Sequence, residues 1–333
     1  MGGVALTTVR VFRSCPEWER EFPVAAGERT AVTVGNFDGV HLGHQRILQC
    51  LVERARGLAA TPVAVTFDPH PARLLRPAEA PPLILTLEQR IARLAELGCA
   101  AVVVLPFTRE LAQLAPEAFV HTILAGCLRA RAVVVGANFR FGHQQAGDVH
   151  RLRVLGQELG LEVEVVPPVK LRGQTVSSTA IRAAVRAGRV SLAGRLLGRP
   201  FALTGTIQPG TGQGRRLVVP TLNLQPEQEL LPASGVYATQ TLLEGRAYWS
   251  ATNVGVRPTF DGHRLTVESH LLDFTEELRE GNLEVRFYSR LRDEQKFASA
   301  AELRAQVLRD IARARRFFLR LERGAALARK YAS

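Results

Sequence analysis

Short apolar runs alternate with segments of helical periodicity up to about residue 185. The apolar runs occupy residues 31–35, 63–67, 101–105, 132–136 and 161–166. The helical segments between them occupy residues 42–58, 86–97, 116–124 and 149–159. Continuous apolar strands joined by helices are typical of parallel sheets covered on both faces, so an α/β domain is predicted. Such a sheet binds ligands at the carboxyl ends of its strands.

The pattern changes after Gly188, where strand-like alternation takes over. A short helix is expected at residues 191–197, followed by the linker Gly-Arg-Pro at 198–200. Strands are expected at residues 236–243, 247–254, 265–271 and 283–288, and the first two flank a hairpin turn at 244–246. We predict an antiparallel β-barrel of about six strands with a C-terminal helix. The expected domains are residues 1–187 and 188–333.

The positive net charge of the chain suggests an anionic partner. The chain of 333 residues carries a formal net charge of +12, and half of that surplus lies in residues 301–333. Basic and apolar side chains alternate there at nearly helical spacing, which indicates an amphipathic helix with a solvated basic face. A nucleic-acid-binding helix is the alternative, but no recognised nucleic-acid motif accompanies it.

Cysteine spacing and hydropathy indicate the cellular compartment that is expected for the protein. Cys15, Cys50, Cys99 and Cys127 share no CxxC spacing, which argues against a zinc knuckle or a redox pair. No apolar run approaches the roughly 18 residues of a membrane span. Charged side chains throughout the first 30 residues leave no signal-peptide core. A reduced cytoplasm and no membrane partner are therefore expected.

The first candidate for chemistry is the segment GNFDGVHLGH at residues 35–44, between an expected strand and helix. Its glycines allow a tight turn, and the helix N-terminus presents free N–H groups to a phosphate. His41 and His44 are three residues apart, so both can donate to charge that develops during phosphoryl transfer. By themselves, two such histidines would more often cap or pack, or bind a metal weakly. The strand–turn–helix context favours nucleotide chemistry, although neither a Walker A loop nor GxGxxG occurs.

Four motifs together resemble the nucleotidyltransferase domain of bacterial bifunctional riboflavin kinase/FAD synthetases. They are GNFDGVHLGH at 35–44, TFDPHP at 66–71, GANFRFG at 136–142 with Gly147-Asp148, and SSTAIR at 177–182. The resemblance implies a Rossmann-like nucleotidyltransferase fold for the first domain. It also implies catalytic roles for His41 and His44, with Arg182 on the leaving pyrophosphate.

Binding residues follow from the same resemblance. ATP is expected at Gly35, Phe37, Asp38, Gly39, Ser177, Thr179 and Arg182. The flavin is expected at Asp68, His70, Asn138, Phe139 and Phe141. Each group has a structural alternative: a proline-fixed turn at 68–71, an ordinary helix cap at 177–179, and two core phenylalanines.

The second domain resembles the riboflavin kinase of the same family. A glycine-rich stretch beginning at Gly205 and including Gly210 precedes PTLN at 220–223, and later segments at 253–260, 268–274 and 291–297 also match. Thr221 and Asn223 supply the oxygen ligands that Mg²⁺ prefers, and Glu268 is the expected base for the ribityl hydroxyl. The alternative is that Glu268 is an exposed carboxylate on a half-buried strand.

The resemblance implies phosphorylation of riboflavin to FMN and adenylylation of FMN to FAD. The expected ligands are riboflavin, FMN, FAD, ATP, ADP, pyrophosphate and Mg²⁺, with no bound redox cofactor and no nucleic acid. Two positions depart from the family: Val218 and Val219 precede PTLN, and 278–281 reads LREG where Tyr-Gly is expected. A transferase that adenylylates another phosphorylated metabolite is the alternative within enzymes, but it does not account for the second domain.

Overall fold

The computed structural model describes residues 9–22, 28–208, 220–259, 262–274, 278 and 280–331. The chain forms two compact units, Met1–Ser178 and Thr179–Ser333. The predicted boundary at 187/188 falls inside the second unit. No helix within the described residues is long and apolar enough to cross a membrane.

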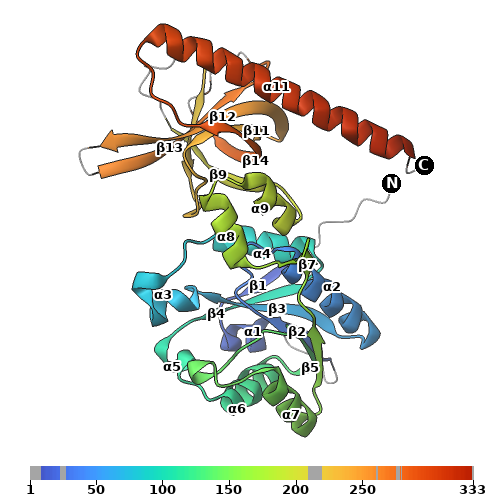
Figure 1. The fold of residues 1–333 in the computed structure, drawn as a ribbon. Coiled ribbons are helices and arrows are strands. Elements are labelled where there is room, and N and C mark those ends of the chain that lie inside the picture. Colours follow the sequence, from blue (N-terminus) through green and yellow to red (C-terminus); the bar gives the residue numbers. More distant parts are fainter. Residues whose placement is uncertain are drawn as a thin grey trace. The chain divides into compact units, whose positions relative to one another are not determined.

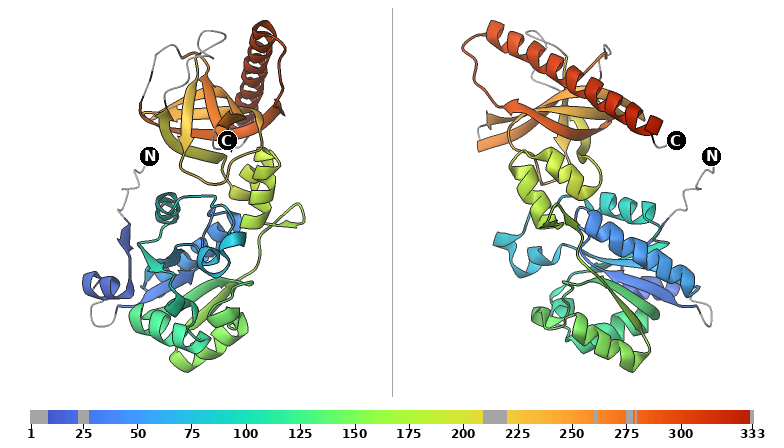
Figure 2. Two further views of the ribbon diagram at one scale, coloured as in Figure 1. Left: turned by 90° about the vertical axis from the view of Figure 1, so that its left-hand side faces the viewer. Right: turned by 45° about the vertical axis from the view of Figure 1, so that its right-hand side comes forward.

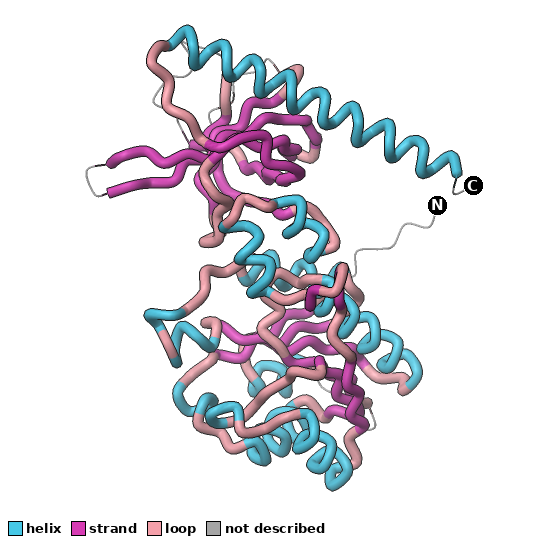
Figure 3. Tube along the Cα trace, viewed as in Figure 1, coloured by secondary structure: helices cyan, strands magenta, loops and turns pink. Residues whose placement is uncertain are grey.

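The first unit is built on a parallel sheet of six strands in the order β1-β4-β3-β2-β5-β6 (Figures 1 and 3). The strands are β1 (Arg10–Phe12), β2 (Thr30–Val34), β3 (Thr61–Asp68), β4 (Ala101–Pro106), β5 (Ala130–Gly136) and β6 (Glu162–Val166). Alternate residues face two separate cores: Val32 and Val63 lie in one, while Ala31 and Ala64 lie in the other. Both faces are therefore buried, as the continuous apolar runs predicted.

Helices cover both faces of this sheet (Figure 2). They are α1 (Cys15–Glu21), α2 (Leu42–Gly57), α3 (Pro71–Leu75), α4 (Leu87–Glu96), α5 (Arg109–Ala112), α6 (Pro116–Phe119) and α7 (Val149–Leu159). Shorter elements are η1 (Pro77–Glu79), η2 (Val120–Cys127), η3 (His143–Gln145), β7 (Lys170–Leu171) and β8 (Gln174–Thr175). A capping box is present at the start of α4, since the side chains of Thr86 and Gln89 accept from each other's backbone N–H. The helix expected at 116–124 is instead α6 followed by a π-helix, η2.

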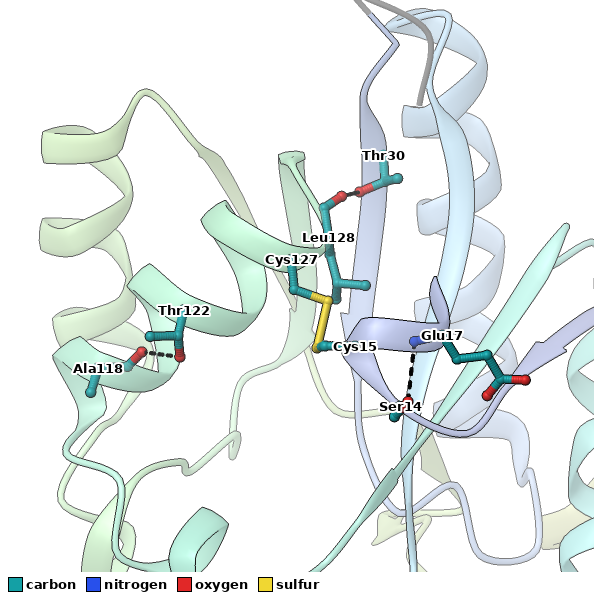
Figure 4. Close-up of a disulfide and its surroundings, with 8 residues drawn as sticks. All are labelled: Ser14, Cys15, Glu17, Thr30, Ala118, Thr122, Cys127 and Leu128. Carbon is teal, nitrogen blue, oxygen red and sulfur yellow. Dashed lines mark hydrogen bonds between the residues drawn. A yellow bond between two sulfur atoms is a disulfide. The ribbon is translucent and has the colours of Figure 1, made fainter. Parts of the chain in front are cut away.

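A disulfide joins two distant segments of the first unit (Figure 4). Cys15 at the start of α1 pairs with Cys127 at the end of η2, 112 residues later, with their Cα atoms 5.8 Å apart. The argument from CxxC spacing concerned neighbouring cysteines only, so it did not predict this long-range pair. Cys50 and Cys99 are free and buried, and burial raises the pKa of both thiols, that of Cys99 to about 12.

The second unit begins with two helices, α8 (Ser178–Arg186, whose first residue belongs to the first unit) and α9 (Val190–Leu197). A closed antiparallel barrel follows, in the order β10-β13-β12-β11-β14-β9. Its strands are β9 (Phe201–Gln208), β10 (Leu222–Pro226), β11 (Gly235–Leu243), β12 (Arg246–Thr259), β13 (Gly262–Leu271) and β14 (Asn282–Asp293). The six-stranded barrel confirms the predicted fold class of the second half.

The barrel interior contains a ring of five buried hydroxyl groups. Around the ring the oxygens of Thr239, Ser250, Thr241, Ser269 and Thr252 are 2.9, 2.9, 2.8, 2.9 and 2.6 Å apart, counting the closing contact to Thr239. All five side chains are completely buried. Each hydroxyl can donate one hydrogen bond and accept one within the ring, so these polar groups are satisfied without water.

The C-terminal helix α11 (Ala300–Tyr331) packs along the outside of the barrel (Figures 1 and 2). Phe318 stacks on Trp249 with ring centroids 3.9 Å apart, and buried Asp310 pairs with Arg292 at 2.8 Å. The basic residues of α11 whose burial is described are exposed: Arg304, Arg309, Arg313, Arg315, Arg316, Arg320 and Arg323. The predicted amphipathic helix with a solvated basic face is confirmed for this part of the helix.

Candidate functional site

The loop at residues 35–44 follows β2 and opens α2, as predicted. Three of its residues have left-handed backbone conformations: Phe37 (φ 48°), Gly39 (φ 88°) and Val40 (φ 40°). Side chains other than glycine rarely adopt positive φ, and each such residue costs on the order of 1–3 kcal/mol when strained. Surrounding contacts therefore have to hold this loop.

Two side-chain contacts from neighbouring segments hold it. The carboxylate of Asp38 is 3% exposed and accepts from the backbone N–H groups of Ile84, at 2.9 Å, and Leu85, at 3.2 Å. The hydroxyl of Ser178 donates to the Asp38 carbonyl at 2.8 Å. The first and fourth motifs are thus in direct contact. At least some of the hydrogen bonds of Asp38 hold the loop itself in place.

His41 and His44 form a stacked pair at the start of α2. Their ring centroids are 3.7 Å apart, and their planes differ by 14°. His41 is the N-cap: its Nδ1 accepts from the backbone N–H of His44 at 3.3 Å. An accepting Nδ1 carries no proton, so a neutral His41 has its proton on Nε2 and can donate from there.

His44 has the environment of a ligand-binding group. Burial, together with the neighbouring His41, lowers the pKa of His44 well below its usual 6.5, so the ring is neutral at neutral pH. Its buried Nδ1 has no hydrogen-bond partner among the described residues. Buried polar atoms are nearly always satisfied in native proteins, so this nitrogen is available to a hydrogen-bonding ligand.

The second and third motifs lie at the same edge of the sheet as the first. Exposed Asp68 ends β3, and His70 caps α3 by accepting from Ala72 N at 3.2 Å. Asn138 and Phe139 follow the end of β5. Because β3, β2 and β5 are adjacent and parallel, their carboxyl ends bring these three motifs together.

The two phenylalanines of the third motif differ in exposure. Phe141 is 6% exposed and belongs to the core below the sheet, whereas Phe139 is only partly buried and stacks on it at 5.4 Å. Phe141 is therefore a core residue, which is the structural alternative that the sequence left open. Phe139 keeps a ring surface for a ligand.

The fourth motif crosses the boundary between the two units. Ser177 and Ser178 belong to the first unit, whereas Thr179 and Arg182 lie on α8 in the second. Arg182 is 8% exposed. Two of these four residues therefore lie in each unit.

In the barrel, Glu268 lies in a row of polar side chains. Glu268 on β13 is directly opposite Asn223 on β10 and Asn253 on β12. Directly paired residues share one face of a sheet, and the flanking Val267 and Ser269 are buried inside the barrel, so the row faces outward. Glu268 therefore lies on the polar, outward face of β13. Asn253 was missed as a site residue, although its segment had been matched to the family.

Two of the remaining kinase predictions fall within the described residues. A Cβ on Gly205 would lie 1.8 Å from the carbonyl oxygen of Gln225, so the pairing of β9 with β10 requires glycine there. Thr221 is exposed immediately before β10. Gly210, Val218 and Val219 lie outside the described residues.

Hard oxygen donors fit the preference of Mg²⁺. Asn223, which carries an amide oxygen, is paired directly with Glu268 across the sheet, and Thr221 carries a hydroxyl two residues earlier. Across the described ranges, no group of three or more His, Cys, Asp or Glu side chains has the arrangement of a metal site. An ion at this row would therefore take several of its ligands from water and from substrate phosphates, as Mg²⁺ commonly does.

Comparison with known proteins gives a consistent result for both halves. The family model described as FAD synthetase matches residues 24–180, and the one described as riboflavin kinase matches residues 197–318. A bifunctional riboflavin kinase/FMN adenylyltransferase from Pseudomonas fluorescens is 39% identical over 284 residues, covering 85% of this chain and 91% of the relative. The protein of that name from Escherichia coli K12 is 37% identical over 295 residues, covering 88% and 94%.

A solved structure has the same overall fold. It is described as a macrolide-efflux protein from Streptococcus pneumoniae, and it matches with a TM-score of 0.82 at 28% identity, covering 92% of this chain and 98% of that one. With two family models in the expected order and relatives matched over nearly their whole length, the chain belongs to the family of bifunctional riboflavin kinase/FMN adenylyltransferases.

Proposed function

We propose that the two reactions of this family are divided between the two units and carried out by the residues described above. The family members phosphorylate riboflavin to FMN and adenylylate FMN to FAD, and both reactions use ATP. The barrel catalyses the first reaction and the parallel-sheet unit the second. FMN, ADP, FAD and pyrophosphate are the products, and no redox cofactor takes part.

In the adenylyltransferase, the FMN phosphate attacks the α-phosphate of ATP and pyrophosphate leaves. In the first unit, ATP is bound by Gly35, Phe37, Asp38, Gly39 and Ser177; the other two expected ATP residues, Thr179 and Arg182, lie on α8 in the second unit. The N-terminus of α2 and the two histidines donate to the phosphoryl group being transferred, where negative charge accumulates.

FMN is bound on the other side of the same edge. Asp68, His70, Asn138 and Phe139 form this part of the site, with Phe139 providing the ring surface against the flavin, while Phe141 supports the Phe139 ring from the core. The single observation that supports the assignment best is the buried Nδ1 of His44, which lacks a partner within the described residues. It lies in the loop where an ATP phosphate is expected.

In the kinase, Glu268 accepts the proton of the ribityl hydroxyl as it attacks the γ-phosphate of ATP. Gly205 and Gly210 form part of the ATP-binding segment. Thr221 and Asn223 hold Mg²⁺, which offsets phosphate charge when bound. Glu268 is paired with Asn223 and Asn253 on the two neighbouring strands, and this position supports its role as the base. We place both reactions in the cytoplasm, with no nucleic acid or membrane partner.

The test is a flavin product assay. The full chain is incubated with riboflavin, ATP and Mg²⁺, and riboflavin, FMN and FAD are separated and quantified. His44→Ala is expected to accumulate FMN without FAD. Glu268→Ala is expected to block riboflavin conversion while added FMN still yields FAD.

Matched controls are available in each unit. His150→Ala removes an exposed histidine from the first unit, and Glu244→Ala removes an exposed carboxylate from the barrel. Both controls should keep both activities. Equal loss of the two reactions in His44→Ala would contradict the proposed division of labour.

A further inference from the structure

Arg90 is a buried cation that the sequence analysis did not select. It lies in the first turns of α4 and is 2% exposed. Among the described residues it forms no ion pair, and its Nε has no hydrogen-bond partner. A buried charge is costly to retain: burial lowers the pKa of Arg90, whereas the carboxylates of Asp38, Asp68 and Glu88 attract the charge and raise that pKa.

The hydrogen bonds of Arg90 join two of the sequence motifs. Nη1 of Arg90 donates to the carbonyl oxygen of Asn36 at 2.7 Å and to the hydroxyl oxygen of Thr66 at 3.2 Å. The Thr66 hydroxyl itself donates to the Asn36 carbonyl at 3.4 Å. Asn36 belongs to the first motif, after β2, and Thr66 opens the second motif, on β3. One guanidinium nitrogen thus fixes the first two motifs relative to each other.

The Asn36 carbonyl is an effective point from which to control the loop. The next residue, Phe37, has positive φ, and its ring packs edge-on against His44 with centroids 5.3 Å apart. Hydrogen bonds from a cation are stronger than neutral ones, so Arg90 holds this strained backbone more firmly than an amide or hydroxyl would. The Asp38 carboxylate also holds the loop. It accepts from the N–H groups of Ile84 and Leu85, which shortly precede Arg90 in the chain.

We propose that Arg90 is a positioning residue for the adenylyltransferase: by fixing Asn36 and Thr66, it sets the geometry of the loop that carries His41 and His44. The inference rests on the proposed function of the first unit. Arg90 acts through the backbone and through Phe37 rather than by touching substrate. Its loss should therefore lower kcat, with little change in the KM for ATP or FMN.

The experiment measures steady-state kinetics of FMN adenylylation by the full chain. Arg90→Met keeps the length of the side chain without its charge and is expected to lower kcat about tenfold to a hundredfold, the range for a misplaced catalytic group. Arg90→Lys restores a cation and should recover a measurable part of that loss. Thr66→Val removes one of the two acceptors and should lower kcat in the same direction by a smaller factor.

The control is Arg93→Met, on the same helix, which removes a partly exposed arginine paired with Glu96. It should leave the kinetics unchanged. Riboflavin kinase activity of each variant, catalysed by the other unit, serves as the internal reference. Circular dichroism and melting curves identify variants that are folded at the assay temperature.

Several results would overturn the inference. One is a folded Arg90→Met variant with the wild-type kcat. Another is a raised KM for ATP in that variant with kcat unchanged, which would indicate direct contact between Arg90 and the substrate. If Arg90→Met does not fold, wild-type kcat in both Arg90→Lys and Thr66→Val overturns it instead. If the wild-type chain makes no FAD from FMN and ATP, the proposed function itself fails.

Discussion

The environment of the His44 side chain suits the phosphate chemistry that we propose for the first unit. Its burial keeps the imidazole neutral, and its stacked neighbour His41 disfavours a second positive charge. A neutral ring donates a hydrogen bond without binding phosphate as tightly as a cation would. Such a donor stabilises the transition state without trapping the substrate or product.

The same lowered pKa predicts a pH-dependent stability. Below about pH 6.5 the unfolded chain binds a proton at His44 that the folded chain does not, so the free energy of unfolding falls as the pH decreases. The loss begins at the unfolded pKa and continues down to the folded one. Urea unfolding of wild type and His44→Gln between pH 5 and 8 tests this.

The variant should show a flatter dependence over the acidic part of that range. His150→Gln, at an exposed position, should keep the wild-type slope. If the slopes of wild type and His44→Gln coincide, His44 is not the residue that titrates.

At the residue scale, the sequence predicted local facts better than contacts. Alternation along residues 265–271 was enough to place Glu268 on the outward face, because strand periodicity is local. Arg90 gave no such signal, since an arginine in an amphipathic helix normally lies at the surface. Its burial depends on Asn36 and Thr66, which are 54 and 24 residues away.

At the scale of elements, strong periodicity predicted α7 to the residue and α2 to within one residue. β1, α1 and α3 were missed because they contain three, seven and five residues, too few for a period to be recognised. The π-helix η2 was also missed, because a local change in helical winding leaves apolar spacing almost unchanged.

The capping box of α4 predicts a measurable stability effect. Thr86→Ala removes the hydroxyl that accepts from Gln89 N and should lower the free energy of unfolding by about 1 kcal/mol. Urea denaturation of the full chain, followed through the transition of the first unit, measures this. Thr86→Ser keeps the hydroxyl and should retain most of the stability; an equal loss in both variants would show that the cap is not responsible.

At the scale of the whole molecule, net charge was a weak guide to the partner. Half of the surplus lies in the C-terminal segment, and the described basic side chains of α11 are exposed while Phe318 and Ala314 pack on the barrel. The family match identifies nucleotides and flavins as the anionic ligands. Sequence alone did not predict the Cys15–Cys127 pair, which depends on the packing of α1 against η2.

That disulfide predicts that reductant affects the two units differently. Opening a closed loop of about 112 residues should lower the free energy of unfolding of the first unit by about 2–4 kcal/mol, mainly through the entropy of the unfolded chain. Calorimetry with and without dithiothreitol should show one transition shifting downward and the other unchanged. Cys15→Ser should melt like the reduced protein and show no further response to dithiothreitol.

The ring of hydroxyl groups inside the barrel has a consequence for proton order. If every hydroxyl donates to the next, the five protons point around the ring either clockwise or anticlockwise, and no single group can reverse alone without leaving two donors face to face. Thr239 is the exception, because its hydroxyl also lies 3.2 Å from the carbonyl oxygen of Ser250, which gives its proton an acceptor outside the ring.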